Sequence, residues 1–185
     1  MEKQERKKLT GRQLALCGMM TALSAVLLEL GGAVPFGTYA CPLLAMTALV
    51  PVLEECGSAS AFIAWAAAGL LGLFLCPDRE TALFFVFLGW YPVLRPRLDR
   101  IHPRALSLAV KLLLMNAAVA AMYGLILFVF RLDGAVSDYE STSRWLTALT
   151  LLLGNAVFAL YDLALCRVTL LYRKKWRKRF FRRSL

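Results

Sequence analysis

Six stretches of mostly apolar residues follow one another along the chain, separated by short segments rich in charge, glycine and proline. A helix needs about 20 residues to cross the roughly 30 Å hydrocarbon core of a bilayer. Most of the stretches come close to that length, and they cover residues 14–31, 40–53, 58–75, 81–94, 106–130 and 145–166. The pattern predicts an all-α integral membrane protein, a compact bundle of about six transmembrane helices.

The second and fourth stretches are shorter than the others, and prolines lie near their ends, at Pro42, Pro51 and Pro92. Proline fits the first turn of a helix but disrupts a helix interior. Tilted spans, partial helices and spans lengthened by their polar flanks therefore all stay open for these two stretches.

Composition agrees with a membrane location. Hydrophobic residues make up 59% of the chain and charged residues only 18%, whereas charged residues alone are about a quarter of a typical soluble domain. Because further apolar stretches follow the first one, we expect it to be a retained helix rather than a secretory signal. The expected organisation is a basic cytoplasmic N-terminus over 1–13, a six-helix membrane domain over 14–172 and a basic, aromatic cytoplasmic tail over 173–185.

The distribution of Lys and Arg tests the number of spans, because the cytoplasmic loops of membrane proteins are enriched in these residues. With six spans and both termini in the cytoplasm, all but three of the 22 Lys and Arg lie on the cytoplasmic side; the exceptions are Arg79, Arg131 and Arg144. The four arginines within residues 95–104 then mark a cytoplasmic loop. Five spans would move one basic cluster outside. A multi-pass protein of the bacterial cytoplasmic (inner) membrane is therefore expected.

The end of the chain, RVTLLYRKKWRKRFFRRSL, interleaves basic residues with Trp176, Phe180 and Phe181. Basic and aromatic residues together can bind nucleic acid, but directly after a membrane helix they are more typical of contact with anionic headgroups. Anionic lipid is thus the expected partner of this tail, and the net charge of +10 requires no nucleic acid.

Signatures of enzymes are missing from the sequence. His102 is the sole histidine, which argues against a histidine-rich metal site and against a Ser-His-Asp triad. No G-x-x-x-x-G-K-[ST] phosphate loop occurs. The pair Glu54 and Glu55 is similar to the start of the Glu-Glu-x-x-x-Arg motif of CAAX-type intramembrane proteases, but Ala59 stands at the arginine position. No enzymatic activity, cofactor or metal site is expected.

The five cysteines all lie in or beside apolar stretches, without a Cys-x-x-Cys pair. This placement is typical of small apolar packing residues. Whether Cys41 and Cys76 form a disulfide stays open.

Polar residues inside the fifth and sixth stretches are costly in lipid and therefore indicate a partner or a function. Lys111 and Asp162 lie at similar distances from the cytoplasmic ends of their helices, at 1.5 Å per residue. We predict that they form an ion pair or share a polar cluster with Tyr161. Asn116 and Asn155 fall near mid-membrane on the same two helices, where they can hydrogen-bond. Contact between helices is the simpler role of these four residues, and solute contact is the alternative.

Charged and polar residues also gather in the segments expected on the outer side. Glu29 lies at the outer end of the first stretch, beside the loop GGAVPFGTYA. The other outer loops add a set of charged residues: Asp78, Arg79, Glu80, Asp133, Asp138, Glu140 and Arg144. They form either a mouth suited to a small polar or zwitterionic solute or ordinary solvated loops.

The first helix, RQLALCGMMTALSAVLLEL, together with six short-looped spans, cytoplasmic termini and no ATP site, resembles the substrate-binding S component of energy-coupling factor (ECF) transporters. In that family an alanine-x-x-x-alanine motif of the first helix packs against the transmembrane T subunit. Gly18 and Ala22 stand at the matching place, and Thr21 and Ala25 form a second small pair. Small residues four apart let two helices approach closely.

The stretches FLGWYPVLRPRLDR and GNAVFALYDLALCRVTLLY are similar to sequences in a Firmicutes branch of S-component-like proteins. The resemblance implies capture of a vitamin or other micronutrient from outside, and uptake driven by a T subunit and two ATPases. Family members bind solute in the outer half, which by position implicates Glu29, Tyr39, Asp78, Asn116 and Asn155. The N-terminal histidines of metal-transporting members are missing here, so nickel and cobalt are not the expected solutes.

A different class of function stays open beside this one. A small multi-helix membrane scaffold of the cell envelope, resembling the MreD family, would have the same composition and topology. Such a scaffold would bind envelope proteins and no solute.

Overall fold

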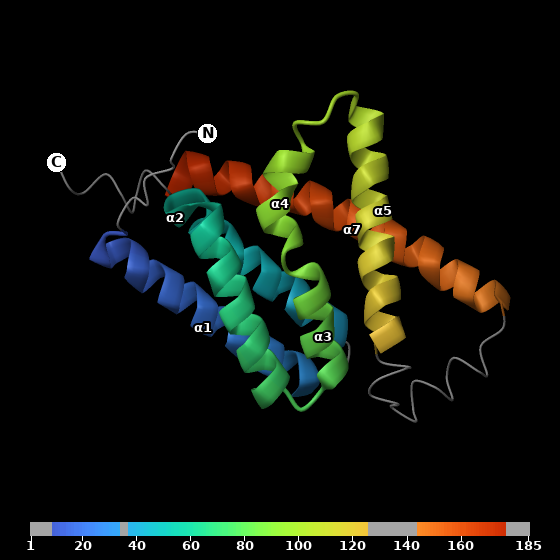
Figure 1. The fold of residues 1–185 in the computed structure, drawn as a ribbon, viewed down its shortest axis with the longest axis horizontal. Coiled ribbons are helices and arrows are strands. Elements are labelled where there is room, and N and C mark those ends of the chain that lie inside the picture. The colour runs from blue at the N-terminus through green and yellow to red at the C-terminus, as the bar shows by residue number, and fades with distance from the viewer. Residues whose placement is uncertain (1–8, 34–36, 126–143, 177–185) are drawn as a thin grey trace. The chain divides into compact units, whose positions relative to one another are not determined.

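The computed structural model describes residues 9–33, 37–125 and 144–176, which are helical apart from short turns, with no strand among them. The helices in chain order are α1 (Gly11–Ala33), α2 (Gly37–Leu75), α3 (Arg79–Leu88), α4 (Tyr91–Leu98), α5 (Arg104–Leu125), α7 (Arg144–Leu171) and the short π-helix η2 (Tyr172–Trp176) (Figure 1). Among them, α1, α2, α5 and α7 are long and apolar enough to cross a membrane. The expected all-helical fold is therefore confirmed for the described residues, with four helices as candidates to span a membrane.

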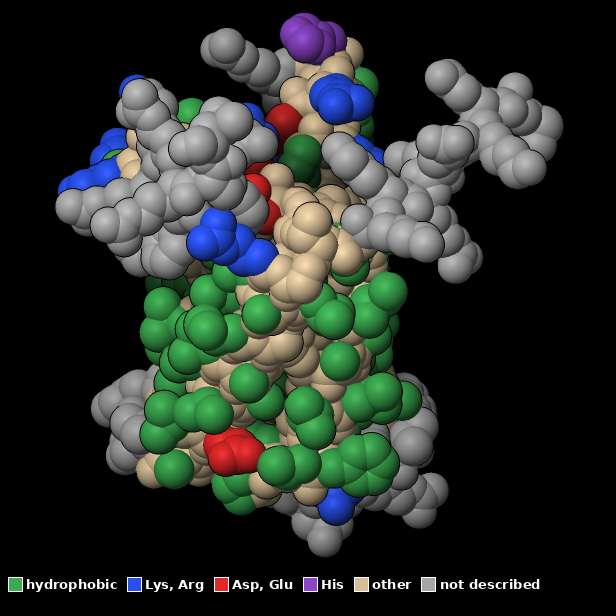
Figure 2. Space-filling model, turned by 90° about the vertical axis from the view of Figure 1, so that its left-hand side faces the viewer, with side chains coloured by type: hydrophobic (Ala, Val, Ile, Leu, Met, Phe, Trp, Pro, Cys, Tyr) green, Lys and Arg blue, Asp and Glu red, His purple; other side chains and the backbone are tan. Residues whose placement is uncertain are grey.

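Large apolar side chains are exposed on all four candidate spans. Leu14 on α1, Ile63 on α2, Leu113 on α5 and Leu152 on α7 are between 64% and 71% exposed. Figure 2 shows such side chains, in green, gathered over one face of the molecule. Apolar surface on this scale is typical of a protein that contacts lipid.

Contacts within the chain group its residues into two units, residues 1–93 and residues 94–185. Unit 1 contains α1, α2 and α3, and unit 2 contains α5, α7 and η2.

A capping box begins α1 in unit 1. The Oε1 atom of Gln13 accepts a hydrogen bond from the backbone N–H of Thr10 (3.0 Å), which satisfies a donor that the helix leaves unpaired. The Nε2 atom of Gln13 donates to the carbonyl oxygen of Glu55 (2.7 Å). The same side chain therefore starts α1 and connects it to α2.

A reversal at Gly57 divides α2 into two arms. Gly57 has φ 85° and ψ 173°, a conformation that essentially only glycine adopts. A straight helix of 39 residues would be about 58 Å long at 1.5 Å per residue, far longer than one bilayer crossing. Each arm alone is close to the roughly 20 residues that a crossing takes.

Contacts with α1 show that the two arms of α2 are antiparallel. The Oγ atom of Ser24 lies 3.0 Å from the carbonyl oxygen of Ala45, to which it donates, so the first arm lies along α1. At the start of the first arm, α1 and α2 lie close together. A Cβ added to Gly31 would be 3.2 Å from the carbonyl oxygen of Gly37. The end of the second arm returns to the same level, because a Cβ on Gly72 would meet Leu28 at 2.8 Å.

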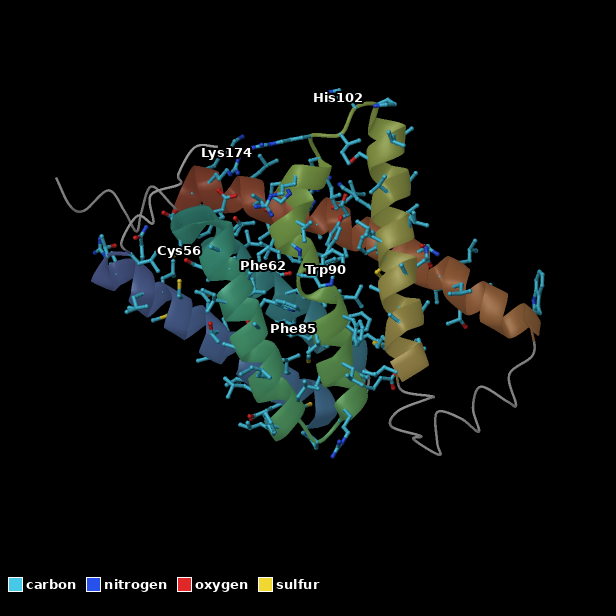
Figure 3. The ribbon with its side chains drawn as sticks, viewed as in Figure 1. Cys56, Phe62, Phe85, Trp90, His102 and Lys174 are labelled. Carbon is cyan, nitrogen blue, oxygen red and sulfur yellow. The ribbon has the colours of Figure 1, made fainter. Side chains whose placement is uncertain are left out.

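The second arm of α2 packs against α3 through small residues. A Cβ on Gly69 would lie 3.1 Å from Val86, and one on Gly89 would lie 2.7 Å from Trp65. Trp65 Nε1 donates to the carbonyl oxygen of Phe85 (3.3 Å). Phe85 itself is fully buried (Figure 3). Unit 1 is thus a bundle of α1, two arms and α3, held together by close contacts at glycines.

Of the alternatives left open for the fourth apolar stretch, residues 81–94, the structure shows partial helices. Helix α3 ends at Leu88, a turn follows at Gly89 and Trp90, and α4 begins at Tyr91. Pro92 has no N–H to donate to the carbonyl of Leu88, so the regular helix is interrupted there. Helix α4 then extends to Leu98, into residues that were predicted to be a loop.

In unit 2, α5 and α7 follow the predicted fifth and sixth stretches, and α5 crosses α7 (Figure 1). Helix α7 continues beyond the predicted end at Cys166 to Leu171, and η2 extends it to Trp176. Residues 126–143, which include the predicted end of the fifth helix, lie outside the described residues.

The backbone of Gly57 leads to a prediction about stability. Gly57→Ala introduces a Cβ in a conformation reserved for glycine, and should lower the free energy of unfolding by about 1–3 kcal/mol. Thermal unfolding in mild detergent measures the change. Gly154→Ala is the matched control, because a Cβ at Gly154 meets nothing within 4 Å and Ala is favoured in a helix interior. Equal stability of the two variants would contradict a glycine-dependent reversal.

Candidate functional site

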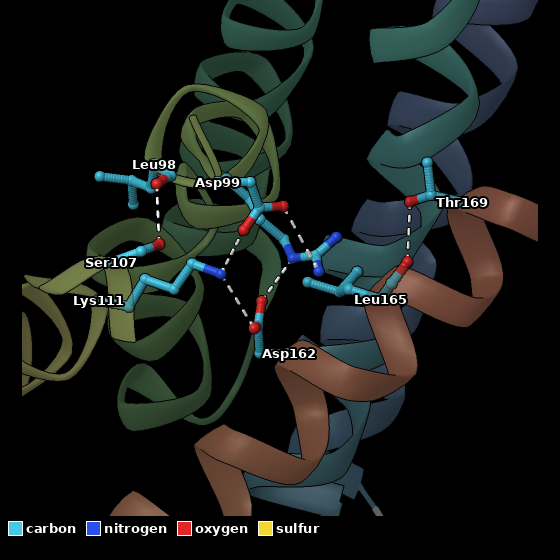
Figure 4. A network of polar contacts seen from close by, with 8 residues as sticks. Leu98, Asp99, Ser107, Lys111, Asp162, Leu165 and Thr169 are labelled. Carbon is cyan, nitrogen blue, oxygen red and sulfur yellow. Dashed lines mark hydrogen bonds and ion pairs between the residues drawn. The ribbon is translucent and has the colours of Figure 1, made fainter. Parts of the chain in front are cut away.

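Four charged side chains of unit 2 form a closed ring of alternating charge, which we call the charge ring: Arg95, Asp99, Lys111 and Asp162 (Figure 4). Lys111 Nζ donates to Asp99 Oδ1 (2.5 Å) and to Asp162 Oδ2 (3.1 Å). Arg95 Nε donates to Asp162 Oδ1. Arg95 Nη2 lies 3.6 Å from Asp99 Oδ2 and closes the ring.

Local structure positions each member of the charge ring. Arg95 and Asp99 are four residues apart at the end of α4, where such pairs face each other on a helix, and the N–H of Asp99 donates to the carbonyl of Arg95 (2.9 Å). Ser107 Oγ donates to the carbonyl of Leu98 (2.8 Å), which holds the start of α5 against the end of α4. Lys111 follows Ser107 by one turn of α5 and so reaches the ring.

Because most of the charge ring is buried, its stability depends on the balance between its positive and negative charges. The side chains of Lys111, Arg95 and Asp162 are only 6%, 12% and 14% exposed. An unpaired charge in such a setting costs several kcal/mol, whereas the ring holds two positive and two negative groups. Arg95 is a permanent cation, because a guanidinium group does not lose its proton in proteins.

The predicted contact between Lys111 and Asp162 is present, and the structure adds two members that the sequence reasoning missed. Arg95 was expected in the loop between the fourth and fifth helices. The structure instead places it on α4, where its side chain contacts Asp162. The spacing of four residues between Arg95 and Asp99 was the available signal. It carried no weight because residues 95–104, with their four arginines, were interpreted as a loop.

The predicted pairing of Asn116 and Asn155 is also present, on the same two helices. Asn116 Nδ2 donates to Asn155 Oδ1 (2.9 Å), and Asn155 Nδ2 donates to Asn116 Oδ1 (3.3 Å). Each amide also donates to the carbonyl four residues earlier in its own helix. Together with the charge ring, this pair sets the register of α5 against α7.

A second polar group lies at the end of unit 1 where α2 begins and α3 starts. Tyr39 Oη donates to Glu80 Oε1 (2.7 Å), and the Tyr39 ring packs edge-on against Phe84. Asp78 caps α3: its Oδ1 accepts from the N–H of Glu80 (3.0 Å) and its Oδ2 from Thr81 Oγ1 (2.6 Å). Both oxygens of Asp78 therefore serve the start of the helix.

Glu29 is half-buried on α1 near the same end of unit 1. Burial raises the pKa of the Cys76 thiol just beyond α2, and hydrogen bonds with the backbone of Asp78 and Gly32 partly offset this rise. Cys41 and Cys76 are free thiols, and Cys76 Sγ donates to the carbonyl of Leu28 (3.2 Å).

The five residues predicted to contact solute divide between the two units. Glu29, Tyr39 and Asp78 belong to unit 1, and Asn116 and Asn155 belong to unit 2. Three acidic residues of the predicted outer mouth, Asp133, Asp138 and Glu140, lie outside the described residues, as does the side chain of Arg144. Within the described part of the chain, no group of three or more His, Cys, Asp or Glu side chains could hold a metal ion.

The small residues of α1 face in two directions. Gly18 and Ala22 are exposed, and a Cβ on Gly18 would meet nothing within 4 Å. Thr21 and Ala25 are partly buried, and Thr21 Oγ1 donates to the carbonyl of Cys17 (2.8 Å). Of the two predicted packing pairs, the pair of Gly18 and Ala22 is the more accessible to a helix of another protein.

Comparison with known protein families, with curated proteins and with solved structures finds no match to this chain.

The alternation of charge in the ring predicts a recovery of stability in a double variant. Lys111→Met and Asp162→Leu should each lower the free energy of unfolding by about 3–5 kcal/mol, because each leaves an uncompensated charge. The double variant leaves the neutral pair of Arg95 and Asp99, so it should be more stable than either single one. Thermal unfolding and yield from the membrane measure this effect.

A polar contact without charge is the control for the ring variants. Asn116→Leu on the same helix should cost only about 0.6 kcal/mol, the average for hydrogen bonds between membrane helices. A double variant no more stable than the worse single one would contradict the coupling between Lys111 and Asp162.

Proposed function

We propose that the chain is the substrate-binding component of an ECF-type importer in the bacterial cytoplasmic membrane. It captures a small solute, such as a vitamin or other micronutrient, from the outer face. A transmembrane T subunit and two ATPase subunits then drive its uptake. The chain crosses the membrane six times with both termini in the cytoplasm, and the two arms of α2 are the second and third crossings and α3 with α4 the fourth.

The open face of α1 is the observation that carries the proposal. The buried residues of this helix, Ser24, Leu28 and Gly31, face the rest of unit 1, whereas Gly18 and Ala22 are exposed. Two small residues one helical turn apart form a shallow surface against which another helix packs closely. This is the contact that the proposed T subunit requires.

The polar groups at one end of unit 1 support the site of capture. In the proposed topology this end faces outward, and it holds Glu29, Asp78 and the hydrogen-bonded pair of Tyr39 and Glu80. Carboxylates, a phenol and helix ends in one place are the groups that orient a small polar solute. The charge ring lies toward the cytoplasmic side in the same topology and is assigned a structural role.

Purification of the complex tests the proposal. The tagged chain is isolated from its native membrane in mild detergent, and mass spectrometry identifies both co-purifying proteins and retained small molecules. We expect a T subunit with two ATPases. Gly18→Leu with Ala22→Leu should reduce their recovery about fivefold or more, because overpacking a close contact costs roughly 1–3 kcal/mol.

A matched variant controls for bulk added to any exposed helix face. Ala59 and Ala66 are exposed on the second arm of α2, and Ala59→Leu with Ala66→Leu should leave the recovered proteins unchanged. Recovery of cell-envelope assembly proteins alone, without a T subunit or a small molecule, would overturn the proposal in favour of a membrane scaffold.

A further inference from the structure

Two cysteines of unit 1, Cys17 and Cys56, meet where the first arm of α2 ends beside α1, and we call them the thiol pair. Cys56 Sγ donates to the carbonyl oxygen of Gln13 (3.5 Å), and Figure 3 labels Cys56 beside α1. In a regular helix the same oxygen accepts the N–H of Cys17, one turn further along α1. The sulfur of Cys56 therefore lies next to Cys17, and the side chains of the two residues are in hydrogen-bonding contact.

A second bond fixes the backbone around the thiol pair. Gln13 Nε2 donates to the carbonyl oxygen of Glu55 (2.7 Å). The residue before Cys56 is thus connected to the residue one turn before Cys17, which holds the two thiols close together. Conversion to a disulfide costs little in hydrogen bonding, because the Gln13 oxygen that loses the thiol keeps the N–H of Cys17.

Small molecules can reach both thiols. Cys17 and Cys56 are partly exposed, and Gly18 and Gly57, the glycines that follow them, are exposed. Exchange between a thiol and a disulfide requires access of the reagent to the sulfur atom. The thiol pair meets this requirement, whereas Cys76 is buried.

The other two cysteines of unit 1 lie further along α1. A Cβ on Gly31 would be 3.1 Å from the Cβ of Cys41, and Cys76 Sγ donates to the carbonyl oxygen of Leu28 (3.2 Å). At 1.5 Å per residue, Gly31 and Leu28 are roughly 21 and 16 Å from Cys17 along the helix axis. A disulfide requires Cα atoms within about 7 Å of each other. Neither of these cysteines can therefore reach the thiol pair.

We propose that the thiol pair is a redox site, which a small-molecule disulfide oxidises to a disulfide between α1 and the end of the first arm of α2. One protein thiolate attacks the reagent, forms a mixed disulfide and releases a small thiol. The other protein thiolate then attacks the protein sulfur of that mixed disulfide and releases a second small thiol. The protein loses two electrons and two protons, and the reagent is reduced to two thiols that carry them. The inference depends on contacts within unit 1 and is independent of the proposed transport function.

The test exposes the full-length chain in mild detergent to glutathione disulfide. The thiols that remain are alkylated with N-ethylmaleimide in denaturant, and mass spectrometry measures the intact chain and its proteolytic peptides. We expect two of the five cysteines to lose their reaction with the maleimide together, without retained glutathione. Cys17 and Cys56 should then be recovered in one cross-linked pair of peptides, and dithiothreitol should restore both thiols.

Two variants separate the thiol pair from general oxidation of the chain. C56S lacks the second thiol, so it should form no internal disulfide and should retain one glutathione on Cys17. C41S/C76S/C166S keeps the thiol pair and should form the same link as the natural sequence does. In the natural sequence, glutathione retained on both Cys17 and Cys56 without a link between them would overturn the proposal. So would a disulfide between other cysteines or between two chains, or a chain whose five cysteines all stay reduced.

Discussion

Neutralisation of buried charge is the constraint on which unit 2 depends. Lys111 and Asp162 sit within helices that are otherwise apolar, and neither is tolerable in lipid without a partner. Arg95 and Asp99 complete the set, so that every charge has two neighbours of opposite sign. The positions of α4, α5 and α7 follow from this requirement, because moving any one of them away would leave a charge uncompensated.

Unit 1 is stabilised differently, by the close approach of its helices at small residues. Gly31, Gly37, Gly69 and Gly72 all lie where an added Cβ would be within 3.2 Å of a neighbour. Without a large hydrophobic driving force between helices in lipid, such contacts gain their energy from dispersion over a tight interface. Ser24 and Gln13 add directional bonds between α1 and α2. The chain thus joins a glycine-packed unit to one joined by polar side chains.

Much of this architecture could be predicted from the sequence, because apolar length is a direct consequence of bilayer thickness. The boundary between the second and third stretches falls at Gly57, where α2 reverses, and the contacts of Lys111 with Asp162 and of Asn116 with Asn155 follow from helix geometry alone. The division of residues 81–94 is consistent with Pro92, which lacks the N–H that a continuous helix needs. The helical course of α4 beyond Leu94 could not be predicted in the same way. It depends on charge contacts from α5 and α7, which involve residues far away in sequence. Asp78 was predicted as a solute ligand, although its two oxygens cap α3 through the nearby residues Glu80 and Thr81.

The reversal of α2 within a single residue has a consequence for how the chain enters the membrane. Two arms joined by Gly57 alone have no intervening loop that could remain in water while the first arm crosses by itself. In the proposed topology they partition as one helical hairpin, with Glu54 and Glu55 at its tip. A charged tip is expensive to move through hydrocarbon. In that topology the one-residue turn therefore keeps both carboxylates together at one membrane surface, in a part of the chain, residues 13–78, that contains no Lys or Arg.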